Sequence, residues 1–296
     1  MTRIITDDRR FYDSKFFMCV NLFQFVFIIV LVLFHLSLIF TTFTTMKKIV
    51  RTVCIVLWKS WFALVFSSLL IILFPFFYFL LKFRQYKAVY SLKKVWAFLI
   101  CLFTGLIPRI RYPYGRFDFP SPSIVVANHT SYLDILFSVF YVKKAAIYMG
   151  KAELLKIPLF NIFFKYLDIP VRRQNPKDAA RAFEKAGEWL DKGYAVIIFP
   201  EGTISPQGVL KPFKNGAFKL AIQKRVPIVP AVNLNNWHLL ENGGFFKSNG
   251  FPGIAHIVVG QPIITDSYNE ENLVDLQNKV RTFIQNELNQ FYEKNR

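Results

Sequence analysis

The sequence predicts an α/β domain with a mostly parallel sheet flanked by helices, preceded by an N-terminal membrane-embedded helical segment. From about residue 117, short runs of β-branched and apolar residues alternate with helical patterns. This alternation is typical of parallel sheets, because parallel strands need a crossover that a helix usually supplies. The amino-terminal part is instead both apolar and basic. We therefore expect three segments: residues 1–45, the helical residues 46–116 and the α/β residues 117–296.

Composition separates this chain from most soluble domains. Of 296 residues, 53% are hydrophobic and 34 are Phe, yet the formal net charge is +18. Such a chain is expected to dock on an anionic membrane surface. Nucleic acid is not an expected partner, because the basic residues gather beside apolar runs of membrane length and no known nucleic-acid-binding module is present. Cysteines and histidines lack metal-ligand spacing, so we expect no metal site.

The first segment contains an apolar stretch, residues 22–45, that is long enough to span a bilayer. It is too long for the core of a signal peptide, and no Ala-x-Ala-like cleavage site is present, so we do not expect a cleaved signal. Met46 is followed by two lysines and would be an ordinary start. Residues 1–45 are therefore either a transmembrane helix or an upstream extension of a protein that begins at Met46.

The second segment, residues 46–116, contains twelve Lys or Arg residues and no acidic residue. Two apolar runs, 60–81 and 95–108, lie between these charges. Positive residues on both sides of the first run do not fit a single crossing. We favour two helices that enter one leaflet and return, with Pro75 bending the first and the cations lying among anionic headgroups. The alternative is a plain transmembrane helix followed by a buried core helix.

A candidate catalytic pair follows the first strand of the α/β segment. After a linker at 112–122, residues 124–127 predict a buried strand, and a helical pattern begins at Ser131. His129 therefore lies in the turn at the carboxyl end of a strand, where open α/β sheets bind ligands. A neutral imidazole is a suitable general base near pH 7, and Asp134 could orient it and stabilise the imidazolium. Alternatively, Ser131 and Asp134 form a capping box with no catalytic role.

The remaining elements alternate regularly. Strands are predicted at 145–149, 169–171, 194–199, 226–232 and 254–260. Helices are predicted at 175–193, 215–223 and 270–291, together with a helix at 151–160 that Pro158 breaks. The apolar run 159–167 is either core or a surface near lipid. Residues 233–253 are predicted to be a long loop.

A second candidate site is the stretch Phe-Pro-Glu-Gly-Thr-Ile-Ser at 199–205. Glu201 comes just past a buried strand, beside Gly202, which allows close backbone approach. Such a turn can hold a hydroxyl of a ligand, and its backbone N–H groups can accept a developing oxyanion. The alternative is a tight turn with a solvated Glu.

Four blocks in this order resemble the 1-acyl-sn-glycerol-3-phosphate acyltransferase family, the lysophosphatidate acyltransferases. They are Asn-His-x4-Asp at 128–134, Arg-Arg at 172–173, Phe-Pro-Glu-Gly-Thr at 199–203 and Val-Pro-Ile-Val-Pro at 226–230. The resemblance covers residues 117–265 and implies a glycerolphosphate-acyltransferase-like fold. It implies that His129 is the general base and Asp134 its orienting partner. It also implies binding of the acceptor by Glu201, Gly202 and Thr203, and of its phosphate by Arg173.

The chain departs from the family's pattern at three positions. Ile204 stands where many members have Arg, Arg172 where Asp is common, and Asn161 where Gly is frequent. Because phosphate recognition needs cationic donors rather than one fixed position, Arg172, Lys211 and Lys214 could replace the missing Arg.

The resemblance implies an enzyme that acylates the sn-2 hydroxyl of 1-acylglycerol 3-phosphate (lysophosphatidate), using acyl-CoA or acyl carrier protein and no further cofactor. The expected location is a membrane, with the active site facing the cytoplasm. Ile204 leaves open a different lysolipid acceptor. A non-catalytic lipid-binding protein with the same fold is the other alternative, which the complete His-x4-Asp block disfavours.

Overall fold

The computed structural model describes the backbone of residues 6–172 and 175–295, with side chains from residue 44 onward except at 176 and 207. The chain divides into two compact units, Met1–Cys54 and Ile55–Arg296. Every strand described lies in the second unit, which carries the elements that position the candidate site.

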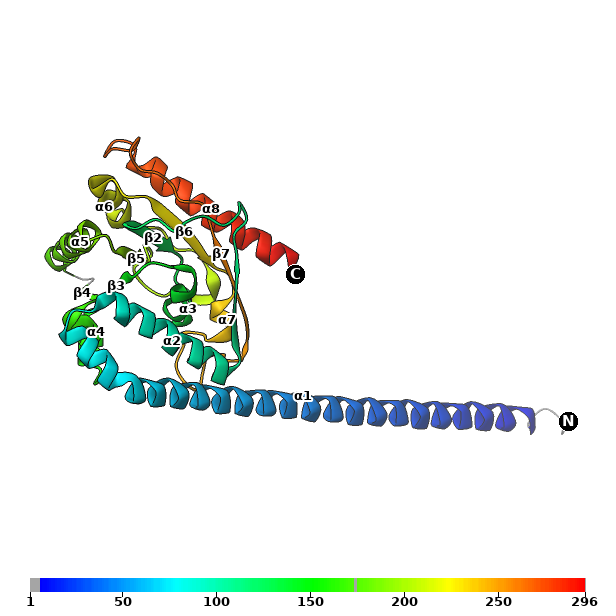
Figure 1. Cartoon of the computed structure of the whole chain (residues 1–296). Coiled ribbons are helices and arrows are strands. Elements are labelled where there is room, and N and C mark those ends of the chain that lie inside the picture. Colours follow the sequence, from blue (N-terminus) through cyan, green and yellow to red (C-terminus); the bar gives the residue numbers. More distant parts are fainter. Residues whose placement is uncertain (1–5, 173–174, 296) are drawn as a thin grey trace. The chain divides into compact units, whose positions relative to one another are not determined.

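The second unit is built around one seven-stranded sheet with the order β1-β7-β6-β2-β5-β3-β4 (Figure 1). Its strands are β1 (Leu106–Arg111), β2 (Ser123–Ala127), β3 (Ala146–Lys151), β4 (Ile169–Val171), β5 (Ala195–Ile198), β6 (Ile228–Asn233) and β7 (Gly253–Val259). Strands β6, β2, β5, β3 and β4 run parallel, whereas β7 pairs antiparallel with β6 and parallel with β1. The predicted mostly parallel sheet is confirmed.

Helices cover both faces of the sheet because its central strand is apolar on both sides. All five residues of β2 are buried. Ile124 and Val126 pack in a core cluster that includes α5 (Pro176–Asp191), α6 (Gly216–Lys224) and α8 (Leu273–Lys294). Val125 and Ala127 pack in a second cluster that includes α2 (Tyr86–Thr104) and α3 (Leu133–Tyr141). This alternation follows from the two-residue period of a strand.

Helix α5 shows that local signals placed helix ends well. The side-chain oxygen of Asn175 accepts a hydrogen bond from the backbone N–H of Lys177 at 3.0 Å, with Pro176 as the first helical residue. Gly193, just past the helix, has φ +81°, a conformation that glycine adopts without strain. The predicted start and stop of this helix are confirmed.

Two predicted helices are wrong in part. The run 95–108 is not all helical: α2 ends at Thr104, Gly105 adopts φ +70°, and Leu106–Arg111 forms strand β1. The segment 151–160 contains only a 3₁₀ turn, Ala152–Lys156, because Pro158 cannot continue a helix and Leu159 adopts φ +63°. Within 159–167, α4 (Asn161–Tyr166) buries Ile162, Phe163 and Phe164, as expected for core.

The predicted loop 233–253 also contains structure. A short helix, α7 (Asn236–Leu239), begins three residues after β6 ends. Four residues are too few for a hydrophobic period to be visible in the sequence.

Helix α1 (Thr6–Lys82) is joined to α2 by a short turn, and we call residues 55–104 the α1–α2 hairpin. The indole N–H of Trp58 donates to the Thr104 carbonyl at 3.0 Å, and that of Trp61 to the Phe103 carbonyl at 2.7 Å. The ring centroids of Phe66 and Trp96 lie 4.8 Å apart. The chain therefore returns along itself, as predicted for the pair of helices, and α1 continues through Pro75 without a break.

The hairpin leaves many apolar side chains in contact with solvent. They include Leu57, Trp61, Leu64, Ile71, Ile72, Phe76, Phe79, Val95, Phe98, Leu102 and Phe103. Among the described residues, one helical stretch, Thr44–Lys82, is long and apolar enough to cross a membrane.

The expectation that all basic residues of 46–116 lie among headgroups is wrong for two of them. Lys93 is buried against Asp168, with 2.8 Å between its ammonium and the carboxylate. Lys59 is buried against the carbonyls of residues 244, 245 and 248. Both partners lie far along the chain, so no local pattern could reveal them.

Candidate active site

The candidate site lies at the edge of the sheet where β2, β5 and β6 end. His129 follows β2 by two residues, Glu201 follows β5 by three, and Asn236 follows β6 by three. Because β2 pairs in parallel with both neighbours, the three carboxyl ends meet at one edge. The loops that carry these residues are therefore brought together by the register of the sheet.

His129 and Asp134 form a buried pair. The Nδ1 atom of His129 lies 2.9 Å from Oδ2 of Asp134, whose side chain is 0% exposed. A carboxylate can only accept, so Nδ1 carries the proton and Nε2 keeps its lone pair in the neutral ring. Within the part of the chain that the structure describes, no group bonds to Nε2. The geometry thus presents a free acceptor nitrogen to an incoming hydroxyl.

The same Asp134 oxygen also accepts backbone hydrogen bonds from Thr130 at 2.6 Å and Ser131 at 2.9 Å. The capping arrangement and the pairing with His129 therefore occur together, and the alternatives drawn from the sequence do not exclude each other. Capping fixes the carboxylate at the start of α3, because the backbone of the turn holds it in place. The ring of His129 bonds to a carboxylate that is already positioned.

Three asparagines complete the support of this pair. The Asn236 amide donates to the second Asp134 oxygen, Oδ1, at 2.7 Å and to Asn233 Oδ1 at 3.2 Å. Asn128 and Asn233 exchange side-chain to backbone hydrogen bonds of 2.7 and 2.9 Å, which join the ends of β2 and β6. Sequence reasoning missed Asn233 and Asn236. The available signal was a run of Asn directly after a strand, at the edge where the other candidates lie.

Glu201 is buried and holds the backbone of the His129 loop. One of its oxygens accepts from the His129 N–H at 2.8 Å and the other from the Lys211 N–H at 2.9 Å. The Ser205 N–H donates to the His129 carbonyl at 2.7 Å. Burial raises the pKa of Glu201, and the two backbone donors oppose that shift. The alternative of a solvated Glu in a turn is wrong, whereas contact of Glu201 with an acceptor stays a prediction.

The rest of the Glu201 loop forms the wall beside the imidazole. Phe199 stacks on the His129 ring, with 4.2 Å between ring centroids. Gly202 has φ +72°, and a side chain there would lie 3.2 Å from the Lys214 side chain, so glycine suits this position. Thr203 is exposed, and its backbone N–H bonds to no group in the described residues.

The predicted cations are distributed around this edge. The Lys211 ammonium donates to the carbonyl of Ile204 at 3.2 Å, so it lies beside the position where many family members have Arg. Lys214 is exposed next to Gly202. Arg172 is exposed after β4, with its guanidinium 3.8 Å from Asp178, and Arg173 lies outside the described residues. β4 is separated from β2 by β5 and β3. Three inter-strand spacings amount to about 14 Å between β2 and β4.

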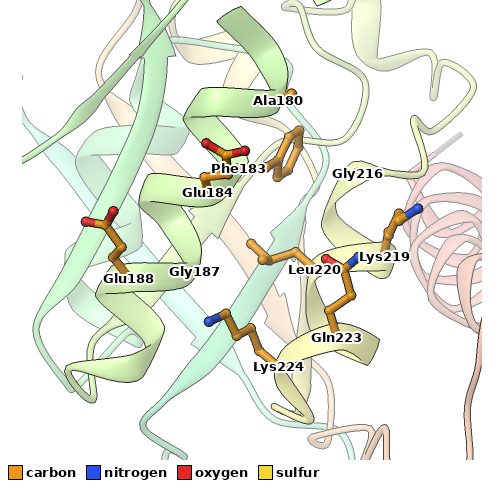
Figure 2. A pocket seen from close by; sticks show the side chains of 10 residues that line it. All are labelled: Ala180, Phe183, Glu184, Gly187, Glu188, Gly216, Lys219, Leu220, Gln223 and Lys224. Carbon is orange, nitrogen blue, oxygen red and sulfur yellow. The ribbon is translucent and has the colours of Figure 1, made fainter. Parts of the chain in front are cut away.

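A cavity of about 520 Å³ lies elsewhere, between α5 and α6 (Figure 2). Its walls include Phe183, Gly187, Leu220 and Lys224, and none of its lining residues belongs to 128–134 or 199–205. Lys224 at its rim pairs with Asp191 at 2.6 Å. We therefore do not assign this cavity to the candidate site.

The chain is similar to several known proteins. Residues 113–233 match a family model described as Acyltransferase. A 1-acyl-sn-glycerol-3-phosphate acyltransferase of Pseudomonas aeruginosa is 28% identical over 241 residues, 79% of this chain and 89% of the relative. The enzyme of the same name from Cocos nucifera is 33% identical over 153 residues, 51% of this chain and 49% of the relative. The chain thus spans about half the length of some curated relatives that it matches.

A solved structure shows the same fold. The 1-acyl-sn-glycerophosphate (LPA) acyltransferase PlsC of Thermotoga maritima matches with a TM-score of 0.69 and 24% identity, covering 82% of this chain and 98% of that one. The matched family region contains the paired His129 and Asp134 as well as Glu201. The chain is therefore similar to the 1-acyl-sn-glycerol-3-phosphate acyltransferases, and residues 113–233 form the matched acyltransferase region.

Proposed function

We propose that the protein transfers a fatty acyl chain from acyl-CoA or acyl carrier protein to the sn-2 hydroxyl of 1-acylglycerol 3-phosphate, giving phosphatidate. The observation that carries this proposal is the buried His129–Asp134 pair, 2.9 Å apart, at the carboxyl edge of the sheet, where no described residue bonds to Nε2 of His129. The names of the relatives support the choice of acceptor.

In the proposed reaction, Nε2 of His129 removes the proton of the acceptor hydroxyl as its oxygen attacks the thioester carbonyl. Asp134 stabilises the imidazolium that forms. When the tetrahedral intermediate collapses, the C–S bond breaks and the proton of His129 passes to the leaving thiolate. The oxyanion can be held by backbone N–H groups of the 201–205 turn, where the Thr203 N–H has no partner among the described residues. This chemistry needs neither a metal nor a cofactor.

One further feature supports the roles of the substrate-binding residues. The Lys211 ammonium at the Ile204 carbonyl supplies a cation where the family's Arg is missing. A charge-assisted hydrogen bond from it to the acceptor phosphate would replace the lost contact. Arg172 and Lys214 are proposed as further phosphate contacts at the same edge. Arg173 is proposed as another on the ground of the family resemblance alone.

Membrane docking is part of the proposal. The exposed apolar surface of the α1–α2 hairpin and the basic residues beside it suit insertion into an anionic leaflet. We place the active site on the cytoplasmic side, where acyl-CoA and acyl carrier protein are found.

The test is release of free thiol from acyl-CoA by purified protein in lipid vesicles that contain lysophosphatidate. General base catalysis contributes about 10²- to 10⁴-fold, so His129→Ala should lose at least about a hundredfold in rate. His256→Ala is the matched control, because His256 packs against Phe291 and does not bond to the dyad. A His129→Ala rate above about a tenth of the wild-type rate would contradict the base assignment.

A second candidate function is acylation of another lysolipid by the same chemistry. Ile204, in place of the family's usual Arg, favours it. Rates measured for lysophosphatidate and for lysolipids with larger headgroups, each with both donors, would separate the two functions.

A further inference from the structure

The segment between α7 and β7 forms a closed loop. Its two ends meet at a bridge between Leu240 and Gly250, and the Glu241 N–H donates to the Asn249 carbonyl at 3.0 Å. The Glu241 carboxylate accepts from the backbone and side-chain amides of Asn249 at 2.8 and 3.0 Å. We call residues 242–247 the tip loop, and all six are exposed.

The tip loop exposes two adjacent aromatic side chains. Phe245 is 42% exposed and Phe246 is 75% exposed, and their rings lie 5.2 Å apart in an edge-to-face arrangement. Lys247, also exposed, follows them directly. Both rings therefore leave apolar surface in contact with water. An exposed apolar pair at a loop tip is typical of a site that contacts a membrane or a protein partner.

A buried lysine from the α1–α2 hairpin fixes this loop. Lys59 is only 4% exposed, and its ammonium donates to the carbonyls of Gly244 at 3.3 Å, Phe245 at 3.1 Å and Ser248. It also bonds to the Ser248 hydroxyl at 2.7 Å. Gly250 packs so closely on α1 that a side chain there would lie 2.8 Å from Cε of Lys59. The tip loop is therefore held directly beside the first helix of the hairpin.

The exposed apolar surface continues from the hairpin toward the tip loop. Trp61 and Phe103 are both exposed, and the Trp61 indole bonds to the Phe103 carbonyl. Just beyond them, exposed Ile107 of β1 pairs with exposed Ile254 of β7, which begins three residues after the loop closes at Gly250. The tip loop thus extends a surface that already suits a bilayer, and Lys247 adds the positive charge that anionic headgroups attract.

We propose that the tip loop is a second membrane-inserting element, in which Phe245 and Phe246 enter the boundary between headgroups and acyl chains of an anionic leaflet. This rests on the proposed docking of the hairpin. Aromatic rings favour that depth of a bilayer. The base of the loop also reaches the active site, because the Ser131 hydroxyl donates to the Leu240 carbonyl at 2.7 Å. Insertion of the tip therefore holds the His129 turn at a fixed height above the leaflet.

The test uses a fluorescent NBD label on a single cysteine, after Cys19, Cys54 and Cys101 are replaced by Ala in the full chain. Phe246→Cys carries the label, and vesicles contain equal parts of phosphatidylglycerol and phosphatidylcholine. We expect NBD emission to shift to the blue on addition of vesicles, and nitroxide lipids labelled near the headgroup to quench it. Val274→Cys, an equally labelled exposed apolar position at the start of α8, should show neither change.

Phe79→Cys, on the exposed face of the hairpin, reports docking itself. If the label at 79 is quenched and the label at 246 stays in water, the tip loop does not insert while the docking proposal stands. If neither is quenched, both proposals fail. A blue shift at 246 before lipid is added would show contact with another protein copy, which also overturns insertion.

A second measurement needs no label. Phe245→Ser combined with Phe246→Ser removes exposed side chains only, so the fold should persist. We expect vesicle binding of the unlabelled protein to weaken by on the order of tenfold, given the apolar area withdrawn from the interface. Val274→Ser is the matched control, and equal binding by the double variant and the wild type would overturn the proposal.

Discussion

The carboxyl edge of the sheet and the α1–α2 hairpin hold their polar groups by different means. At the edge, the groups that surround His129 come from residues within a few positions of a strand end, and they bond to one another in a closed set. In the hairpin, Lys59 and Lys93 reach partners 189 and 75 residues away. The difference shows that the register of neighbouring strands brings the catalytic groups together, although His129 and Glu201 lie 72 positions apart and Asp134 and Asn236 lie 102 apart. The hairpin is instead attached through buried side chains such as Lys59 and Lys93.

The largest expected effect tests whether the closed set at the edge acts as a unit. Asp134→Asn replaces one of the two carboxylate oxygens with an NH₂ group, which cannot accept a hydrogen bond. One oxygen accepts from His129, Thr130 and Ser131, and the other accepts from Asn236. We expect the rate of thiol release to fall by about a hundredfold or more, because the imidazolium loses its partner. The exposed variant Asp266→Asn is the control, and its rate should stay at the wild-type level. A modest loss at Asp134, within tenfold, would show that capping is its main role.

Next comes the attachment of the hairpin. Lys93→Met leaves Asp168 buried without its cation, and we expect the free energy of unfolding in detergent to fall by about 3 kcal/mol. Adding Asp168→Asn should restore part of this loss, since it removes the unpaired charge. Lys87→Met, on the exposed face of α2, should change the unfolding free energy by less than about 0.5 kcal/mol. Equal effects of the two Lys variants would mean that the ion pair does not attach the hairpin.

A smaller effect on the rate is expected for Asn236, which was not predicted from the sequence. Asn236→Ala removes one donor to Asp134 but leaves its other three hydrogen bonds in place. We expect kcat to fall by about tenfold, in line with one hydrogen bond to a charged group, with KM for the acceptor unchanged. Asn289→Ala on α8 is the control. A change in KM alone would instead place Asn236 in contact with substrate.

The smallest effect separates phosphate binding from chemistry. Lys211→Met removes the ammonium at the Ile204 carbonyl but keeps the backbone N–H that bonds to Glu201. KM for lysophosphatidate should rise by several-fold while kcat stays constant, because the lost contact is the same in ground and transition states. Lys192→Met, in the loop after α5, is the matched control. An equal rise in KM with an uncharged 1-acylglycerol acceptor would contradict the phosphate role.

How much of the structure could be predicted from the sequence depends on how far apart the interacting residues lie. The strands at 123–127 and 195–198, the start of α5 and the meeting of His129 with Asp134 depend on neighbours within about six positions, and all were predicted. The partners of Lys59 and Lys93 depend on the packed fold and were not. Strand β1 was missed because its pairing with β7 is set by residues about 150 positions away, and an apolar run gives no period that distinguishes strand from helix.

The double attachment of the His129 backbone, through its N–H to Glu201 and its carbonyl to the Ser205 N–H, has a consequence for substrate choice. These two hydrogen bonds couple the base to the loop that contains Ile204, so we expect a shift of one to move the other. We therefore expect acceptor preference to change through substitution of side chains, such as those at positions 204 and 211, while the backbone of the loop stays in place. Loop lengthening between 201 and 205 would move the imidazole and cost turnover with every acceptor alike.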